Sequence, residues 1–173
     1  MKIKKTLLGL LFLSLVTIVS QSCQKSEEDD DNQDPVQPAE ITETAFGLNM
    51  KLVKVTGSTF QMGSSDYDWA QPVHSVTLST FYLGKLEVTQ AQWRAVMGTS
   101  PSYFSGCDDC PVERVSWDDA HAFIQKLNQA SGRNYTLPTE AQWEYAAGGG
   151  ATNRTKWAGT NDENSLGNYA WFS

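Results

Sequence analysis

The pattern of hydrophobic and polar residues divides the chain into an apolar leader, a polar stretch and a longer segment of mixed patterning. The first five residues, MKIKK, carry three lysines, and a predominantly apolar run follows over residues 7–19. A charged start before a short apolar run is typical of a secretory signal peptide, and a run of this length is too short to span a bilayer comfortably as a helix. We therefore predict a signal peptide over residues 1–22, with an uncleaved N-terminal membrane anchor as the alternative.

The leader ends at a cysteine that is preceded by small residues. The stretch SQSC, which ends at Cys23, resembles the lipobox of bacterial lipoproteins, although Ser20 stands where an apolar residue is commonest. In such proteins the cysteine becomes the acylated first residue, and two or three acyl chains hold a protein firmly to a membrane. We expect Cys23 to be lipidated and to attach the protein to the outer membrane.

A polar and acidic stretch follows Cys23. It reads QKSEEDDDNQDPVQPAE and has too few apolar residues to form a core. We predict that residues 23–45 are a flexible tether, whose plain role is that of a solvated spacer. The acidic run at 25–31 also resembles the signal that sends some lipoproteins to the outer face of the outer membrane. Placement on the cell surface and a periplasm-facing position therefore both stay open.

Residues 46–173 carry the patterning of a folded domain. Residues 51–55 and 59–62 alternate apolar with other residues around Gly57 and Ser58, which predicts a hairpin. Residues 73–83 are rich in β-branched and aromatic residues, which favour strand. From residue 152 onward the pattern has no clear period, so we predict a loop there.

Three short helices are predicted by their N-terminal capping residues. Helices are expected to begin after Thr89, Ser116 and Thr139, in the stretches TQAQ, SWDD and TEAQ. We predict that the first helix carries a hydrophobic staple of Val88 and Trp93. The second is expected to stop at Gly132 and the third at residues 148–150. The apolar face predicted for the second helix consists of Ala120, Phe123, Ile124 and Leu127.

Charge and histidine content exclude two kinds of site. The net charge is −7 and the pI is about 4.7, which argues against binding nucleic acid through its phosphates. The chain has only two histidines, His74 and His121, so it cannot build a three-histidine metal site by itself. We expect both to be structural, hydrogen-bonding residues. For Glu87, Glu140 and Glu144 we expect helix capping and hydrogen bonds to buried amides.

Two of the three cysteines lie three residues apart in a loop. Cys107 and Cys110 stand in the stretch GCDDCPV. In an oxidising compartment, this spacing favours a tight disulfide. Free thiols are one alternative, and metal binding or redox chemistry is another, although a zinc site would need two more ligands nearby.

Five stretches together resemble the formylglycine-generating enzyme family, the sulfatase-modifying factors. They are TFQMGS at 59–64, QPVHSVTLSTFYLGKLEVTQAQW at 71–93, CPVERVSWDDAHAFIQKLN at 110–128, LPTEAQWEYAAGGG at 137–150 and GNYAW at 167–171. The resemblance implies an α+β, C-type-lectin-like fold with little regular secondary structure, which we expect to be incomplete at the C-terminus. Thr136 and Gly148 stand where the family usually has arginine, so an ion pair or backbone clamp is expected to be missing or replaced.

The resemblance also implies cofactors. Oxidase members of the family use a pair of cysteines that binds copper, and no cysteine of this chain corresponds to that pair. We therefore assign no catalytic residue, and we expect the chain as given to be inactive and its fold unstable. The family's calcium site uses the asparagine and the following residue that correspond to Asn168 and Tyr169, so these two residues are predicted to form part of a calcium site.

Two functions remain in competition at this point. One is oxidation of a sulfatase cysteine to formylglycine, the activity of the family's oxidases, with a protein or peptide as substrate. The other is a non-catalytic binding or structural module on the same fold, tethered to the membrane through Cys23. Fold alone does not decide between them.

Overall fold

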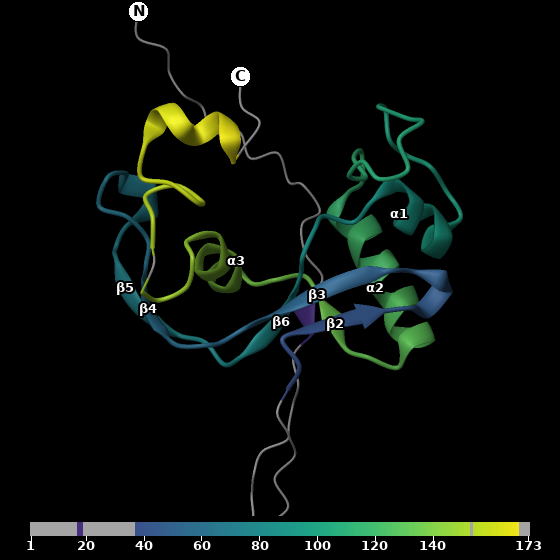
Figure 1. Cartoon of the computed structure of the whole chain (residues 1–173), viewed down its shortest axis with the longest axis horizontal. Helices are drawn as coiled ribbons and strands as arrows, with labels where there is room; N and C mark the ends of the chain where they lie inside the picture. The colour runs from purple at the N-terminus through teal and green to yellow at the C-terminus, as the bar shows by residue number, and fades with distance from the viewer. Residues whose placement is uncertain (1–16, 19–36, 153, 170–173) are drawn as a thin grey trace, which may run out of the picture.

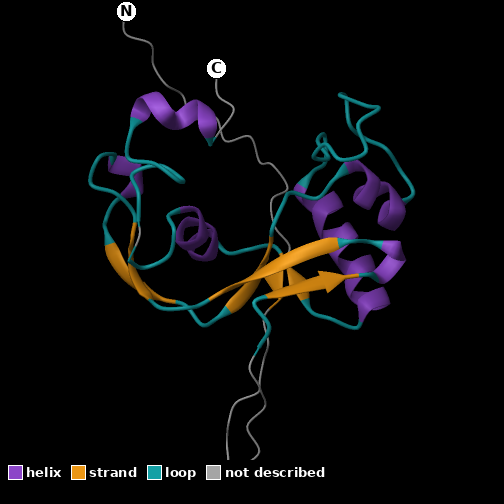
Figure 2. Ribbon diagram, viewed as in Figure 1, coloured by secondary structure: helices purple, strands orange, loops and turns teal. Residues whose placement is uncertain are grey.

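The computed structural model describes residues 17–18, 37–152 and 154–169 (Figure 1). They form a mixed α+β structure in which long loops join short strands and helices (Figure 2). The strands are β1 (Thr17–Ile18), β2 (Glu40–Glu43), β3 (Met50–Val55), β4 (Thr59–Met62), β5 (His74–Thr77), β6 (Phe81–Gly84) and β7 (Tyr135–Thr136). The helices are α1 (Gln90–Met97), α2 (Trp117–Ser131) and α3 (Glu140–Ala147), with 3-10 turns η1 (Ala45–Gly47), η2 (Asp68–Ala70) and η3 (Glu163–Asn168). Among the described residues, no helix is both long enough and apolar enough to cross a membrane.

A long antiparallel ribbon forms the backbone of the fold. Strands β3 and β6 pair with Val55 opposite Phe81, and β4 and β5 pair with Thr59 opposite Thr77. The pairing is interrupted between β3 and β4 on one side and between β5 and β6 on the other, and the register is the same before and after this interruption. Residues 50–62 therefore run beside residues 74–84 as one bent ribbon. Figure 1 shows this ribbon as the long curve from β3 and β6 to β4 and β5. At the interruption the backbone of Gly57 lies very close to Leu78. A Cβ added to Gly57 would be 2.2 Å from the carbonyl oxygen of Leu78.

The predicted hairpin of residues 51–55 with 59–62 is therefore wrong. These two segments lie end to end on the same side of the ribbon, and each pairs with a strand from residues 74–84. The Gly57 amide donates to Thr80 Oγ1 (3.1 Å), which fixes the connection to the opposite segment. Gly57 is needed for close backbone approach, which local patterning cannot distinguish from a turn.

The ribbon extends into a five-stranded sheet with the order β2-β3-β6-β1-β7. Strand β2 pairs with β3 over residues 40–43. Strand β2, from Glu40 to Glu43, thus lies within the residues 23–45 that were predicted to be a flexible tether. The folded part starts earlier than the predicted boundary at residue 46, because Ile41 packs against the core and Glu43 is buried.

Two apolar clusters fill the two ends of the structure. The larger one joins β3 to helices α1 and α2, and the smaller one joins the ribbon to α3. The larger consists of Leu48, Met50, Leu52, Val88, Trp93, Val96, Val112, Phe123, Ile124, Leu127 and Tyr135. The smaller consists of Phe60, Phe81, Leu83 and Tyr145.

The helix predictions are confirmed. Thr89, Ser116 and Thr139 are the N-caps, and each closes a capping box in which backbone and side chain bond reciprocally. The four residues predicted for the apolar face of α2 are its buried residues. Gly132 ends α2 in the left-handed conformation, with φ of 68°, as glycine permits. The staple residues Val88 and Trp93 lie in one core cluster.

Candidate functional site

A loop over residues 98–116 projects beyond α1 and α2, and we call it the projecting loop. It starts after α1 and returns to the N-terminus of α2. In the structure the sulfurs of Cys107 and Cys110 are bonded, 1.97 Å apart. The amide of Gln90 donates to the Cys110 carbonyl (2.9 Å), and the amide of Ala91 donates to the Asp108 carbonyl (3.0 Å). The disulfide turn therefore satisfies the first amides of α1 and holds the loop against that helix.

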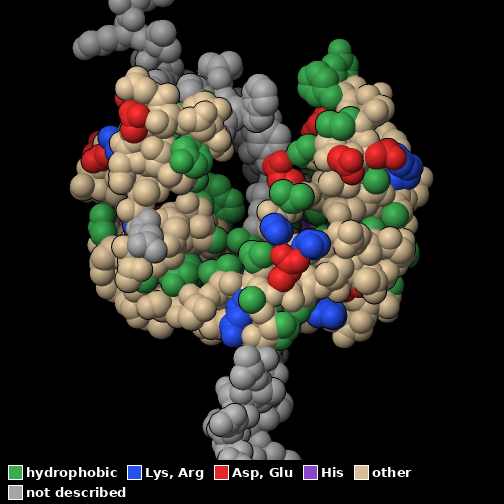
Figure 3. All heavy atoms as spheres, in the orientation of Figure 1, with side chains coloured by type: hydrophobic (Ala, Val, Ile, Leu, Met, Phe, Trp, Pro, Cys, Tyr) green, Lys and Arg blue, Asp and Glu red, His purple; other side chains and the backbone are tan. Residues whose placement is uncertain are grey.

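Two aromatic rings are exposed on the projecting loop. Tyr103 is 65% exposed and Phe104 is 74% exposed, and their rings meet edge to face at 5.1 Å. The guanidinium of Arg114 lies 4.8 Å above the Tyr103 ring. Hydrophobic side chains are visible at the tip of this projection (Figure 3). Neighbouring exposed aromatic side chains are typical of a surface that meets another molecule.

The backbone under these rings is held by side chains. The amide of Phe104 donates to Glu113 Oε1 (2.8 Å), and Gln90 Nε2 donates to the Phe104 carbonyl (2.9 Å). Arg94 pairs with Asp108 at 2.8 Å across an exposed surface. The exposed rings are therefore presented on an anchored loop, which reduces the entropy that binding would cost.

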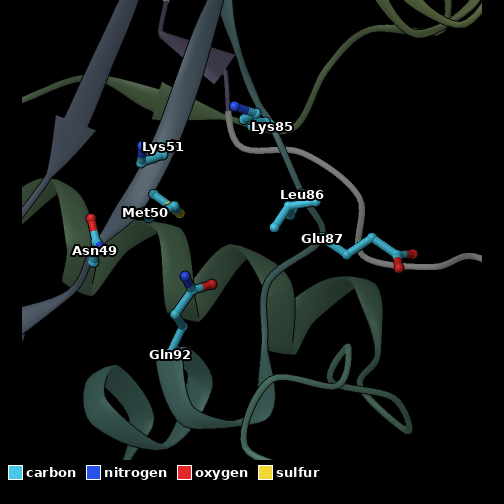
Figure 4. Close-up of a pocket in the computed structure, with 7 residues that line it drawn as sticks. All are labelled: Asn49, Met50, Lys51, Lys85, Leu86, Glu87 and Gln92. Carbon is cyan, nitrogen blue, oxygen red and sulfur yellow. The ribbon is translucent and has the colours of Figure 1, made fainter.

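A small pocket lies where β3, the segment after β6 and α1 meet (Figure 4). Its volume is about 220 Å³, below the usual range of pockets that hold small-molecule ligands. Its lining residues are Asn49, Met50, Lys51, Lys85, Leu86, Glu87 and Gln92. A pocket of this size suits a single side chain of a partner better than a cofactor. Sequence reasoning did not find it, because its residues come from segments that are distant along the chain.

Charges around the pocket are largely paired. Lys51 Nζ and Lys85 Nζ lie 3.1 and 3.3 Å from the two carboxylate oxygens of Glu40. Hydrogen bonds from Lys51 and then from Lys85 lower the pKa of Glu40 below its ordinary value. Partial burial raises the pKa of Glu87. Leu86 is 74% exposed at the rim, so the pocket offers an apolar contact beside polar groups.

A second cluster of charges connects α3 to the ribbon. Glu144 accepts from the Gly63 amide (3.1 Å) and pairs with Arg154 at 2.7 Å. The Arg154 guanidinium also lies 5.0 Å from the centre of the Phe60 ring. A Cβ at Gly148 would be 2.9 Å from Arg154 Nη1. Arg154 thus fills the space beside Gly148, which stands where the family usually has arginine. The role expected for Glu144, bonding an amide, is what the structure shows.

The two histidines lie apart, and neither is placed with a catalytic partner among the residues described. His74 is exposed on β5, with Nδ1 2.9 Å from the Pro72 carbonyl. The His121 ring lies 3.7 Å from the ring of Trp117 on α2. Glu140 is in the first turn of α3. The structural roles expected for these residues stay predictions.

The predicted calcium ligands lie near the end of the described chain. Asn168 ends η3 and Tyr169 follows it as the C-cap. The Tyr169 ring covers Gly159, where a Cβ would be 2.4 Å from the ring. In the described part of the chain, no group of three or more His, Cys, Asp or Glu side chains is placed to hold a metal. The calcium site stays a prediction from the family resemblance.

Comparison with known proteins decides the family. The model of the sulfatase-modifying factor enzyme 1-like domain matches residues 37–171. The chain belongs to this family. Its start at residue 37 agrees with the position of β2 and again places the domain boundary before residue 46.

Relatives of known name cover parts of this chain. The chaperone protein LppX of Paenibacillus barcinonensis is 34% identical over 155 residues, which cover 70% of this chain and 52% of that protein. The formylglycine-generating enzyme of Streptomyces coelicolor is 42% identical over 69 residues, covering 40% of this chain and 20% of the enzyme. The chain spans about half the length of LppX, so activities of whole relatives do not transfer directly.

A solved structure confirms the fold. Treponema denticola variable protein 1 superposes with a TM-score of 0.69 at 33% identity, over 79% of this chain and 65% of that protein. The α+β, formylglycine-generating-enzyme-type fold implied by the sequence motifs is therefore correct.

Proposed function

We propose that this chain is a lipid-anchored, protein-binding member of the sulfatase-modifying factor family, and that it does not oxidise cysteine. The observation that carries the proposal is the exposed pair Tyr103 and Phe104 on the projecting loop, which the Cys107–Cys110 disulfide turn holds against α1. The remaining cysteine, Cys23, is the predicted lipid attachment site.

The surface supports binding of protein rather than of a small molecule. Tyr103 and Phe104 are exposed on an anchored loop, and a second exposed pair, Tyr67 and Trp69, stacks at 5.2 Å. Aromatic side chains of this kind are enriched in protein interfaces. One relative, which matches 70% of this chain, is named a chaperone protein, and chaperones bind other proteins.

Oxidation of a sulfatase cysteine is the second candidate. The local identity of 42% with the Streptomyces coelicolor enzyme favours it. That match covers 20% of the enzyme, so the activity of the whole enzyme rests on residues outside the match.

The experiment measures both activities on protein exported with its own leader and purified from membranes. Cu(I)-dependent oxidation is assayed on a cysteine-containing sulfatase peptide. Binding is assayed with reduced, carboxymethylated lactalbumin, a permanently unfolded protein. We expect no formylglycine, and lactalbumin binding that weakens at least about tenfold when Tyr103→Ser and Phe104→Ser are combined, since aromatic anchors dominate binding energy.

The matched control combines Phe46→Ser with Val73→Ser, two exposed hydrophobic residues outside the projecting loop and outside the pocket. Both variants remove apolar surface, but only the first removes the aromatic pair. Formylglycine formation by the purified chain would overturn the proposal. Equal lactalbumin binding by all three proteins, or none by the wild type, would also overturn it.

A further inference from the structure

One arginine of this chain differs from the others in its contacts. Of the four arginines in the sequence, Arg94, Arg133 and Arg154 each pair with a carboxylate. Arg114 is exposed on the projecting loop, and among the described residues it forms no ion pair. Its guanidinium lies 4.8 Å above the Tyr103 ring. This contact leaves the N–H donors of the guanidinium without an acceptor in the described part of the chain.

The backbone of Arg114 is held in an unfavourable conformation. Its φ is 61°, in the left-handed region that residues with a long side chain rarely adopt. Contacts on both sides hold it there, because the amide of Glu113 donates to Ser102 Oγ (3.1 Å) and Ser116 caps α2. An exposed side chain gains little packing that would offset this strain. Stability alone would favour glycine at this position, so the arginine points to a role for its side chain outside the fold.

Arg114 and the exposed aromatic pair form one surface, which we call the arginine–aromatic surface. The Tyr103 ring lies under the Arg114 guanidinium and meets the Phe104 ring at 5.1 Å. The bond from the Phe104 amide to Glu113 Oε1 (2.8 Å) joins the two sides of the loop beneath these groups. Figure 1 shows the loop above α1, away from β2 and β3. Its two ends join α1 and α2, so contacts within the described chain fix the geometry of the surface.

The charges on this loop indicate which anion the guanidinium can meet. A guanidinium binds a carboxylate or a phosphate through parallel N–H bonds. The projecting loop also carries Asp108, Asp109 and Glu113, and the net charge of the chain is −7. A densely anionic partner, such as a phospholipid surface, would therefore be repelled. A polypeptide segment with a single carboxylate beside a large apolar side chain matches both Arg114 and the aromatic rings.

We propose that the arginine–aromatic surface binds polypeptide segments in which an acidic residue stands beside a large apolar residue. Arg114 pairs with the carboxylate, and Tyr103 and Phe104 cover the apolar side chain. The inference rests on the proposed function, since it names the chemical class of segment that the same loop binds. The rings contribute most of the affinity, and the guanidinium selects among apolar segments by their charge.

The test compares two labelled peptides, GSFEFLSG and GSFQFLSG, which differ in one carboxylate and have nearly the same shape. Binding to protein exported with its own leader and purified from membranes is measured by fluorescence anisotropy at low ionic strength. We expect the wild type to bind the glutamate peptide at least about threefold more tightly than the glutamine peptide, since an exposed ion pair adds a modest gain. Tyr103→Ser combined with Phe104→Ser should weaken binding of both peptides at least about tenfold.

Variants at Arg114 separate recognition from folding. Arg114→Met removes the cation and keeps an apolar side chain, so the two peptides should then bind equally. Lys126→Met, which removes an exposed cation on α2, is the matched control and should keep the preference for glutamate. Arg114→Gly should also lose the preference. Its melting temperature should rise or stay within about 2 °C of the wild type, because glycine adopts the left-handed conformation without strain.

Three results would overturn the inference. One is a wild type that binds the two peptides equally or not at all. Another is a preference for glutamate that persists in Arg114→Met, or that Lys126→Met loses to the same extent. The third is a melting temperature of Arg114→Gly that falls by more than about 2 °C, which would assign the side chain to the fold.

Two further measurements distinguish this inference from its alternatives. Vesicles of anionic phospholipid that bind the wild type and not Arg114→Met would assign the guanidinium to a membrane and overturn the inference. If the two peptides bind equally and lactalbumin binding still depends on Tyr103 and Phe104, the proposed function stands and this inference alone fails.

Discussion

Single side chains make the long-range connections that hold β7. Asn128 bonds both backbone groups of Tyr135, and Glu43 accepts the hydroxyl of the same tyrosine across 92 residues of sequence. Burial, followed by the hydrogen bond to Glu43, raises the pKa of Tyr135 well above its ordinary value. Both contacts can be tested one side chain at a time.

Replacement of Asn128 by alanine should destabilise the domain. Asn128→Ala leaves the amide and carbonyl of the buried Tyr135 without their partner, which costs about 2–4 kcal/mol of unfolding free energy. Urea denaturation followed by circular dichroism measures the loss. The exposed neighbour Gln129→Ala is the control, and it should change stability by less than about 0.5 kcal/mol. An Asn128→Ala midpoint equal to that of the control would show that β7 does not depend on this side chain.

Alkaline pH should weaken the fold through Tyr135. Because the folded pKa lies above the unfolded value of 10.0, the contribution is complete below pH 10 and is lost as the pH rises above it. The unfolding free energy should fall by up to about 1.4 kcal/mol per pH unit more in the wild type than in Tyr135→Phe. Denaturation at pH 8, 9, 10 and 11 checks this, and parallel curves for the two proteins would refute it.

A few polar contacts hold the short helices to loops and strands elsewhere in the fold. The disulfide turn bonds to the start of α1, and Glu144 on α3 bonds to Gly63 after β4. These contacts position the projecting loop and α3, respectively, against the rest of the domain.

The disulfide should be present in the exported protein and should stabilise the projecting loop. Mass spectrometry without reductant should show the peptide that carries Cys107 and Cys110 lighter by two hydrogens. The loop that the bond closes is short, so Cys107→Ser with Cys110→Ser should cost roughly 2 kcal/mol. Complete alkylation of both thiols without a reductant would contradict the prediction.

An exchange of arginine positions tests the contact between α3 and Arg154. Arg154→Ala removes the ion pair with the half-buried Glu144 and should cost about 1.5–3 kcal/mol. Adding Gly148→Arg, the residue common in the family, should restore most of the loss because the space beside Gly148 is then empty. Lys156→Ala, whose 3.7 Å contact with Asp66 is exposed, is the control. Failure of the second arginine to restore stability would show that the position cannot replace Arg154.

At the scale of the whole molecule, the proposed lipid anchor concerns where the domain lies in the cell. A lipid at Cys23 would place the domain beside a membrane.

Lipidation is predicted to depend on Cys23. Labelled palmitate should enter the exported protein and should be absent from Cys23→Ala. Cys107→Ala with Cys110→Ala is the matched control and should keep the label. Label retained in Cys23→Ala, or a soluble mature wild-type protein, would contradict the prediction. Protease treatment of intact cells distinguishes surface display from a periplasm-facing position.

The sequence alone predicted the features whose interacting atoms lie within a few residues of one another along the chain. Capping boxes depend on side chains three residues from the N-cap, and the buried face of α2 follows from its helical period, so both were predicted correctly. The five motifs identified the family, and the C-x-x-C spacing indicated the disulfide that the structure contains.

Only the tertiary structure decided which strands pair and which charges meet. Residues 51–55 and 59–62 alternate as a hairpin would, yet each pairs with a strand from residues 74–84, because strand edges carry no local record of their partner. The bond between Glu144 and the Gly63 amide and the pocket at Glu87 likewise join segments distant in sequence. Local hydrogen bonds are fixed by neighbouring residues, whereas these contacts depend on how the whole chain buries its apolar surface.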